Sequence, residues 1–473
     1  MSTVQRVAKN TGVVIVGNVI FKILSLLVMI YLARYLLPTE FGKYNFVFAY
    51  LAFFMLLPDL GLQSILVREI SRDLSKASKF IGNASIIRLI LSAIAIVLSI
   101  VTITFMSYPE DTTTYVYIAA FTLLFQSFSN LYSSLFRANL RMVYDVSAKL
   151  VFRILSACLI FWVIFSHGTL ALIMAIMVFS EGIGMLISYI FSRKFVKLRF
   201  EIDFGLWKYL IKESLPLTLS VAVWTIYHQI DMVMLSPMMG DEAVGIYSAA
   251  HKLFEPFSLI PMAIMVSLFP ILSESFKKSG DKLLKSYRLS IKYLLIIALP
   301  VAIGVILLAD KIILLIFGVS FTNSASVLRI LITSIVFSFM SIVLLELLIS
   351  IDKQKLHTLS AAMGAIVNVI LNFMLIPILS YNGAAIATLA TYTVLFIASF
   401  YFVSKHLQTI PIHKILVKPV ISGLIMGAFI YYFAELNMLL LVPLAGIVYL
   451  VALVALRTFT EEDWNIAKKI IKF

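Results

Sequence analysis

Long, unbroken runs of apolar residues recur along the whole chain and are separated by short polar stretches. About 14 such runs, each close to the 20 residues that a helix needs to cross a bilayer, lie near residues 11–33, 41–60, 80–106, 115–136, 147–166, 169–191, 213–236, 242–269, 289–309, 323–349, 357–378, 383–404, 415–434 and 438–456. Strands of a membrane barrel would alternate apolar and polar residues over about ten positions, whereas these runs are continuous. The pattern therefore predicts an all-α polytopic membrane protein with about 14 transmembrane helices.

Composition excludes a water-soluble enzyme. Of 473 residues, 62% are hydrophobic and 13% are charged, whereas soluble domains have about 45–50% apolar and 25% charged residues. The net charge of +14 fits basic loops that contact anionic lipid headgroups, so we expect the bilayer and no nucleic acid as a partner. Cys158 is the only cysteine, which excludes an intramolecular disulfide and a cysteine metal site.

The placement of lysine and arginine predicts the topology. Outside the apolar runs, nearly all of the 38 Lys and Arg residues lie in one alternating set of loops and in the two tails. The other set of loops holds only Arg34, Lys43 and Lys311. Because cytoplasmic loops carry the excess of basic residues, we expect an even number of crossings in the cell membrane, with both termini cytoplasmic.

An internal repeat predicts the domain organisation. Residues 37–50 (LPTEFGKYNFVFAY) and 240–253 (GDEAVGIYSAAHKL) both place a glutamate shortly before Gly-x-Tyr. A second pair of similar segments is 166–175 and 380–390. Repeats in the same sense predict two parallel six-helix bundles related by an axis along the membrane normal. We assign these bundles to residues 1–200 and 201–406, and we assign two additional helices and a cytoplasmic tail to 407–473.

Several functional motifs are absent from the sequence. It contains no G-x-x-x-x-G-K-[ST] loop for a nucleotide and no G-x-S-x-G nucleophile turn,. Its six histidines lack the spacing of a zinc site,. The sequence therefore predicts no enzyme, no metal site and no cofactor, and it leaves transporters, channels and membrane scaffolds as candidate classes.

Three segments resemble a known family. Residues 32–45 (LARYLLPTEFGKYN), 59–73 (DLGLQSILVREISRD) and 368–392 (NVILNFMLIPILSYNGAAIATLATY) are similar to polysaccharide-export flippases of the O-antigen repeat-unit type. These flippases belong to the multidrug/oligosaccharidyl-lipid/polysaccharide exporter superfamily. The resemblance implies that a polyprenyl-(pyro)phosphate-linked oligosaccharide moves from the cytoplasmic to the outer leaflet by alternating access, for cell-surface glycan assembly.

Two other functions stay open at this point. The first is a cation-coupled multidrug exporter of the same superfamily, and the second is a non-transporting scaffold for glycan assembly enzymes. The resemblance names the lipid-linked oligosaccharide as the substrate and glycan assembly enzymes as candidate partners. Basic residues within the apolar runs favour an anionic substrate over the cationic substrates of drug exporters.

Four intramembrane cations are the candidates for binding the substrate headgroup, because a charge within a span is costly and faces a cavity or a partner. They are Lys22, Arg88, Arg153 and Lys252. Lys22 also matches a position where related peptidoglycan-precursor flippases carry an arginine. The alternatives are snorkelling to the headgroup layer for Arg88 and Arg153, and an ion pair with Glu255 for Lys252.

Three carboxylates within the apolar runs are the candidates for ion coupling. They are Asp231, Glu255 and Glu181. A proton or a sodium ion bound to such a group could couple transport to a gradient, and structural pairing with a neighbouring cation is the alternative.

Overall fold

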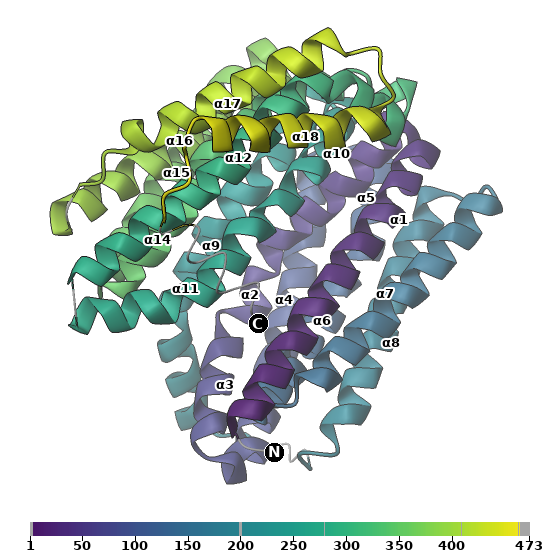
Figure 1. The fold of residues 1–473 in the computed structure, drawn as a ribbon. Helices are drawn as coiled ribbons and strands as arrows, with labels where there is room; N and C mark the ends of the chain where they lie inside the picture. The colour runs from purple at the N-terminus through teal and green to yellow at the C-terminus, as the bar shows by residue number, and fades with distance from the viewer. Residues whose placement is uncertain (1–2, 198–200, 279, 408, 462, 464–473) are drawn as a thin grey trace. The chain divides into compact units, whose positions relative to one another are not determined.

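The chain is helical throughout the computed structural model, which describes residues 3–197, 201–278, 280–407, 409–461 and 463. No β-strand occurs within these ranges. The helices, labelled in Figure 1, are α1 (Thr3–Phe54), α2 (Leu56–Asp59), α3 (Leu62–Arg72), α4 (Ala77–Phe105), α5 (Glu110–Ala119), α6 (Phe121–Ala138), α7 (Met142–Phe165), α8 (Leu170–Ser192), α9 (Phe204–Met239), α10 (Asp241–Phe254), α11 (Leu259–Lys278), α12 (Gly280–Phe317), α13 (Ser324–Thr333), α14 (Ile335–Ser350), α15 (Gln354–Leu379), α16 (Tyr381–His406), α17 (Ile412–Tyr432) and α18 (Met438–Ala455). Short 3₁₀ turns lie at Leu74–Lys76, Glu255–Ser258 and Val319–Phe321.

The predicted fold class is confirmed. Each of the predicted apolar runs falls on one helix or on two consecutive helices. Among the described residues, 10 segments are long and apolar enough to cross a membrane by length and composition. The first two predicted spans are continuous as α1, which is interrupted at Leu37 (φ 59°, ψ 173°). Pro38 follows and has no backbone N–H to continue the hydrogen-bond ladder, so the predicted turn between the two spans lies at this interruption.

The chain divides into two compact units, Met1–Ser248 and Ala249–Phe473. In unit 1, α7 packs along α1 and against α8, and α6 packs against α3, α4 and α8; Figure 1 shows α7 and α8 side by side. Helix α9 also belongs to unit 1, where it contacts α1 and α3. In unit 2, α15 and α16 form the most extensive helix pair, and α14 packs against α16.

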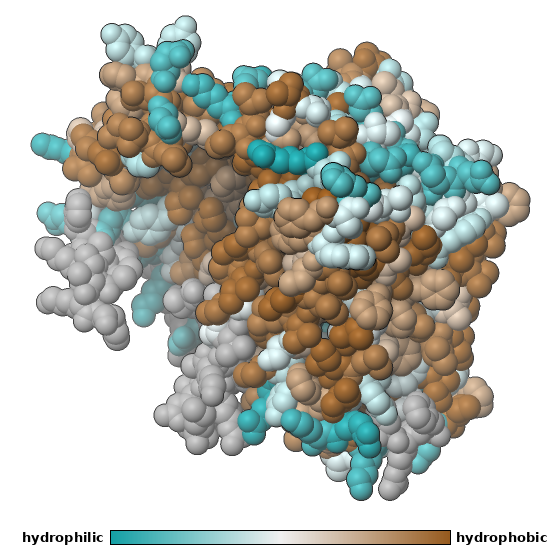
Figure 2. Space-filling view, turned by 90° about the vertical axis from the view of Figure 1, so that its right-hand side faces the viewer, coloured by the Kyte–Doolittle hydropathy of each residue, from teal (hydrophilic) through white to brown (hydrophobic). Residues whose placement is uncertain are grey.

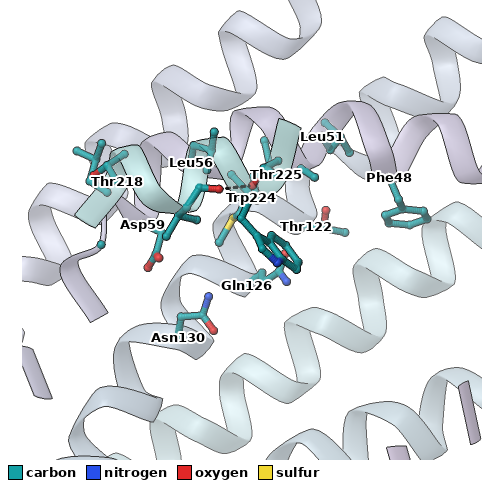
Figure 3. Close-up of a pocket in the computed structure, with 16 residues that line it drawn as sticks. Phe48, Leu51, Leu56, Asp59, Thr122, Gln126, Asn130, Thr218, Trp224 and Thr225 are labelled. Atoms are coloured by element: carbon teal, nitrogen blue, oxygen red, sulfur yellow. Dashed lines mark hydrogen bonds between the residues drawn. The ribbon is translucent and has the colours of Figure 1, made fainter. Parts of the chain in front are cut away.

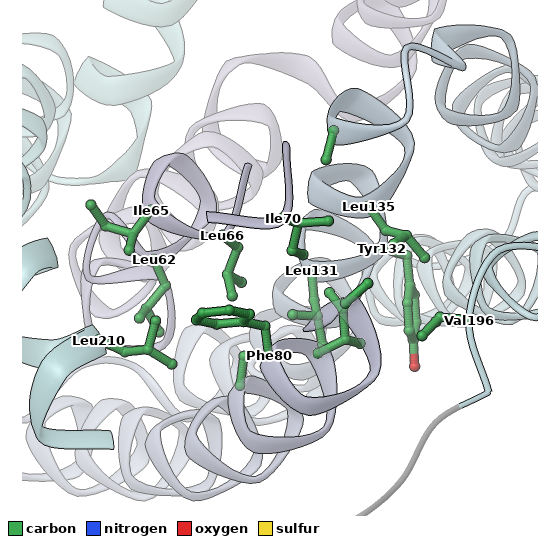
Figure 4. Packing of buried hydrophobic residues seen from close by; sticks show 14 of the residues in the cluster. Leu62, Ile65, Leu66, Ile70, Phe80, Leu131, Tyr132, Leu135, Val196 and Leu210 are labelled. Carbon is green, nitrogen blue, oxygen red and sulfur yellow. The ribbon is translucent and has the colours of Figure 1, made fainter. Parts of the chain in front are cut away.

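An apolar core joins four helices of unit 1 (Figure 4). Leu62, Leu66 and Ile70 of α3 gather near Phe80 of α4, and Leu131 and Leu135 of α6 complete the cluster together with Leu210 of α9, Ile65, Tyr132 and Val196. The α3 residues recur at intervals of three and four, which is the spacing of one helix face. This face fixes α3 against its neighbours.

Large apolar side chains also cover the outer faces of the helices. Phe105 and Phe165 are 83% and 80% exposed, and Tyr432 and Leu439 are exposed to a similar extent. On the face shown in Figure 2, hydrophobic residues cover broad continuous areas. Apolar surface on this scale requires lipid rather than water as its surroundings.

The two repeat segments, residues 37–50 and 240–253, contact each other directly. A Cβ atom built on Gly42 would lie 1.7 Å from the carbonyl oxygen of Asp241. A Cβ atom built on Gly245 would lie 1.9 Å from the carbonyl oxygen of Pro38. The glycine of each repeat thus packs on the backbone of the other, and only a residue without a side chain permits this approach. The two glycines of the repeat therefore allow these segments to pack closely within unit 1.

The last two helices are anchored to α12. Helices α17 and α18 pack against each other and against α12, and the Tyr449 hydroxyl donates a 2.9 Å hydrogen bond to the Ile296 carbonyl. Beyond α18, the buried Asp463 carboxylate pairs with Lys292 and accepts a 2.7 Å hydrogen bond from the Tyr293 hydroxyl. Burial acts to raise the pKa of Asp463, but hydrogen bonds from Lys292, the Thr460 N–H and Tyr293 outweigh it and hold the pKa at about 2.

We expect this carboxylate to make the stability of unit 2 depend on pH. A carboxyl pKa below the unfolded value of about 3.9 stabilises the folded state above that value, and the contribution is lost as the pH falls toward the folded pKa of about 2,. Asp463→Asn should therefore melt at a lower temperature than the wild type at pH 6, and the gap should narrow between about pH 4 and 2. A gap that stays constant over that interval would contradict the assignment.

Candidate functional site

Unit 1 contains two adjoining cavities with polar walls. The larger has a volume of about 360 Å³, which lies within the range of about 300–1,000 Å³ that is typical of small-molecule pockets. Its walls come from α1, α2, α6 and α9, and Figure 3 shows the side chains that face it. Its polar and aromatic lining residues are Phe48, Asp59, Thr122, Gln126, Asn130, Thr218, Trp224 and Thr225.

Helix periodicity explains the polar wall that α6 contributes. Thr122, Gln126 and Asn130 are spaced by four residues, so they form one stripe on the helix, and all three face the larger cavity (Figure 3). Helix α9 also presents Trp224 to this cavity, and its ring centroid lies 4.3 Å from that of His228 one turn later. The cavity thus combines neutral hydrogen-bonding groups with an aromatic ring.

A sharp break between α2 and α3 shapes the same wall. Gly61 has φ 69°, a left-handed conformation that favours glycine,. A Cβ atom at this position would lie 2.8 Å from the Leu217 Cβ and 3.1 Å from the Ser214 carbonyl oxygen. Gly61 therefore lets the chain turn and lets α9 approach closely, which brings Thr218 and Trp224 to the cavity.

Arg88 lies behind the larger cavity and holds Asp59. Its guanidinium is fully buried and donates a 2.8 Å hydrogen bond to Asp59 Oδ1 and another to the Ser127 carbonyl. Arg88 lines neither cavity, whereas Asp59 lines the larger one. In this conformation Arg88 acts on the cavity through Asp59, as a positioning residue that also neutralises the carboxylate.

The smaller cavity, of about 180 Å³, shares Gln126 and Asn130 with the larger one. Its charged lining residues are Asp145, Lys149, Arg153 and Glu181. Lys149 pairs with Asp145 at 3.0 Å. The Arg153 guanidinium carbon lies 5.0 Å from the Phe152 ring centroid, and no carboxylate of the described residues lies within 4.0 Å of its nitrogens. The guanidinium of Arg153 therefore retains hydrogen-bonding capacity for an anion.

The structure brings two of the predicted site residues together and places the others elsewhere. Arg153 of α7 and Glu181 of α8 line the same small cavity. Lys22 of α1 is half-buried and lines neither cavity, although its neighbour Phe21 lines the smaller one. The assignment of Lys22 to the substrate headgroup stays a prediction.

The remaining candidates lie around α9 and α10. Asp231 is buried, and its Oδ2 accepts a 2.5 Å hydrogen bond from the Tyr247 hydroxyl. The Lys252 ammonium lies 3.9 Å from Glu255 Oε2, which is the ion pair that the sequence offered as an alternative. Glu255 begins the 3₁₀ turn Glu255–Ser258, so the helix changes geometry at this carboxylate. Within the described ranges, no group of three or more His, Cys, Asp or Glu residues could hold a metal ion.

Sequence reasoning missed the neutral part of the site. Gln126 and Asn130 stand four residues apart inside an apolar run, and this signal was available. Trp224 gave no such signal because an aromatic residue is common within a membrane helix. Asp145 and Lys149 were also missed, because they lie near the start of α7, where charges are expected in a loop.

We expect Asp59 to be required for stability because Arg88 is buried beside it. Removing one partner of a buried ion pair typically costs about 3–5 kcal/mol, whereas apolar replacement of both partners is often neutral. Asp59→Ala should therefore lower the melting temperature of the detergent-solubilised protein, and Arg88→Met combined with Asp59→Ala should restore much of the loss. A double variant less stable than Asp59→Ala would show that Arg88 does not depend on Asp59.

Two family models match the chain. The model described as "Polysaccharide biosynthesis protein" matches residues 7–276, and the model MatE matches residues 216–374. The probable flippase AglR of Haloferax volcanii is 29% identical over 191 residues, which are 39% of this chain and 40% of that protein. The capsular polysaccharide biosynthesis protein CapF of Staphylococcus aureus is 22% identical over 404 residues, which are 84% and 99% of the two chains. The chain spans half or less of the length of the first curated relatives that it matches.

Solved structures share the fold. The inward closed conformation of the lipid II flippase MurJ superposes with a TM-score of 0.80 at 15% identity, covering 92% of this chain and 97% of that one. An inward-facing multidrug resistance MATE family transporter has a TM-score of 0.66 at 15% identity, covering 82% and 94%. At these identities the likeness concerns the fold alone. Since the first family model covers more than half of the chain, this multi-pass membrane protein belongs to the polysaccharide biosynthesis protein family.

Proposed function

We propose that the protein is a flippase that moves a polyprenyl-(pyro)phosphate-linked oligosaccharide from the cytoplasmic to the outer leaflet by alternating access. The observation that carries the proposal is the pair of adjoining cavities in unit 1. One contains Arg153, which has no carboxylate of the described residues at ion-pair distance, and the other has neutral polar side chains from α6 on its wall. A charged phosphate and a polar glycan are the two parts of such a headgroup.

The physical problem that a flippase solves is the cost of polar groups in hydrocarbon. A charge at the centre of a bilayer costs several kcal/mol, and unpaired hydroxyl groups add to this cost. A cavity lined by Gln126, Asn130 and Arg153 replaces the lost water contacts, while the polyprenyl chain stays in the lipid. These residues supply both neutral and cationic hydrogen-bond donors to the headgroup.

The names of similar proteins support the same class of activity. They include a probable flippase AglR, a putative O-antigen transporter of Shigella flexneri and the lipid II flippase MurJ of Bacillus subtilis. Each of these names describes a transporter rather than an enzyme. We carry this activity to the chain as part of the proposal.

The alternative of a multidrug exporter fits the cavities less well. An organic cation would need a carboxylate with free negative charge, but Asp59 pairs with Arg88, and Asp145 pairs with Lys149. Glu181 shares its cavity with Arg153 as well as Lys149. A scaffold without transport activity has no need of either cavity.

Replacing Arg153 should impair transport without affecting insertion. In proteoliposomes that contain a polyprenyl-pyrophosphate-linked oligosaccharide, Arg153→Gln should lower the flipping rate by at least about tenfold, because a hydrogen bond to a charged group contributes about 1.5–3 kcal/mol. Arg193→Gln is the matched control, since Arg193 is exposed at the end of α8. A wild-type flipping rate in Arg153→Gln would show that Arg153 does not bind the phosphate. Absence of flipping by the wild-type protein would refute the flippase proposal.

The energy source is a separate part of the proposal. The sequence has no nucleotide-binding loop, so we propose coupling to a proton or sodium gradient through Asp231, Glu255 or Glu181. A bound ion shifts a two-state equilibrium only through different affinities for the two states. The alternative is that glycan assembly enzymes remove the product at the outer leaflet and thereby drive net transport.

An imposed gradient distinguishes these two sources. If an ion is coupled, wild-type proteoliposomes should flip faster with a proton or sodium gradient than without one. Asp231→Asn or Glu255→Gln should abolish that acceleration while substrate binding persists. Equal rates with and without both gradients would leave these carboxylates with structural roles, such as the contacts of Asp231 with Tyr247 and of Glu255 with Lys252.

A further inference from the structure

We propose that the larger cavity of unit 1 is a binding subsite for a neutral pyranose ring. The inference rests on the proposed flippase function, because it assigns part of the headgroup to this cavity. It goes further by stating which chemical class of sugar the cavity accepts and which residues select it. Three independent features of the cavity carry the inference.

The first feature is the exposed aromatic ring of Trp224. The side chain is 52% exposed, and Figure 3 shows its ring extending into the cavity that Gln126 and Asn130 also line. His228 packs against the ring from the following turn, with the two ring centroids 4.3 Å apart. A pyranose ring has an apolar face of C–H groups and a rim of hydroxyls, and the face of an indole ring is a suitable surface for those C–H groups.

The second feature is a set of amide groups with unused hydrogen-bonding capacity. The side-chain amides of Gln126 and Asn130 make no hydrogen bond to any described residue, although they stand inside a membrane helix. Each amide offers a carbonyl acceptor and two N–H donors. Sugar hydroxyls both donate and accept, so they can satisfy the two amides together.

The threonine hydroxyls of the cavity complement the amides as acceptors. Thr122 donates to the Ala119 carbonyl at 2.6 Å, and Thr225 donates to the Val221 carbonyl at 2.9 Å. Because their protons are engaged by the backbone, these oxygens present lone pairs to a ligand. A ligand with several hydroxyl donors fits this wall better than an apolar ligand or one that only accepts.

The third feature is the charge balance of the cavity. Asp59 is the one carboxylate among the described residues that line it, and the buried Arg88 neutralises it at 2.8 Å. The paired carboxylate still accepts hydrogen bonds from hydroxyls, but it attracts an organic cation only weakly. It also disfavours a ligand that carries a carboxylate of its own. The cavity should therefore prefer neutral hexoses and N-acetylhexosamines over hexuronic acids.

The neighbouring cavity completes the arrangement. Because Gln126 and Asn130 line both cavities, a ligand that fills the larger one lies next to the space that Arg153 faces. The smaller cavity suits a phosphate because the basic side chains of Lys149 and Arg153 line it. A sugar-phosphate headgroup can then place its ring against Trp224 and its phosphate toward Arg153.

Saturation-transfer NMR on the protein in lipid nanodiscs tests the subsite without a lipid-linked substrate. The probes are methyl glucoside, methyl N-acetylglucosaminide and methyl glucuronide, with tetraphenylphosphonium as an organic cation. We expect binding of the two neutral glycosides, and affinity at least about fivefold weaker in Trp224→Leu and in Gln126→Leu, from the loss of stacking or of hydrogen bonds. Trp224→Phe should keep part of the affinity because it keeps an aromatic face.

Two control variants test whether the loss of glycoside binding is specific to the larger cavity. Trp162→Leu changes a tryptophan of similar exposure (58%) on α7 and should bind the glycosides like the wild type. Arg153→Gln should also keep glycoside binding, because the probes carry no phosphate. The inference is overturned if neither neutral glycoside binds, if binding is unchanged in both Trp224→Leu and Gln126→Leu, or if methyl glucuronide or the cation binds more tightly than the neutral glycosides.

Failure of this inference and failure of the flippase proposal are distinguishable. Trp224→Leu should also lower the flipping rate in proteoliposomes by at least about fivefold. A wild-type flipping rate in that variant would contradict the sugar subsite but not the flippase function. Glycoside binding by a wild-type protein that flips no lipid-linked oligosaccharide would keep the subsite and refute the flippase function.

Discussion

A polar side chain within an apolar helix needs either a partner or a polar cavity, because contact between a charge and lipid tails is costly. This constraint organises unit 1. The helices cover their outer faces with large apolar side chains. The polar residues that instead face the two cavities are Asp59, Gln126, Asn130, Asp145, Lys149, Arg153 and Glu181. The cavities are thus a consequence of where polar residues can be placed in a membrane helix.

Two arginines show the two ways in which this constraint is met. Arg88 is fully buried and bonded to Asp59 and to the Ser127 carbonyl. Arg153 faces a cavity and packs against Phe152, with no carboxylate of the described residues at ion-pair distance. The first arrangement supports the wall of a site and sets its charge, whereas the second keeps a cation available to a ligand. Residue type alone does not distinguish the two roles.

Close backbone contacts give these polar groups a defined frame. Gly42 and Gly245 pack on the backbone of each other's segments, and Gly61 lets α9 approach the break between α2 and α3. A side chain at Gly61 would separate α9 from the break between α2 and α3, and a side chain at Gly42 or Gly245 would separate α1 from α10. The same physical requirement explains why the glycine is shared by the two repeat segments, which otherwise differ at most positions.

The sequence alone determined the fold class, because continuous apolar runs of bilayer length have one stable solution, the membrane helix. It also named seven intramembrane charges as candidate site residues, Arg153 and Glu181 among them, since an intramembrane charge is rarely without a role. Only the tertiary structure decided that Arg88 supports Asp59, that Arg153 shares a cavity with Glu181, and that Gln126, Asn130 and Trp224 face one space. The physical reason is that helix periodicity places a residue on a face, whereas the partner of that face is set by contacts between segments far apart in the chain.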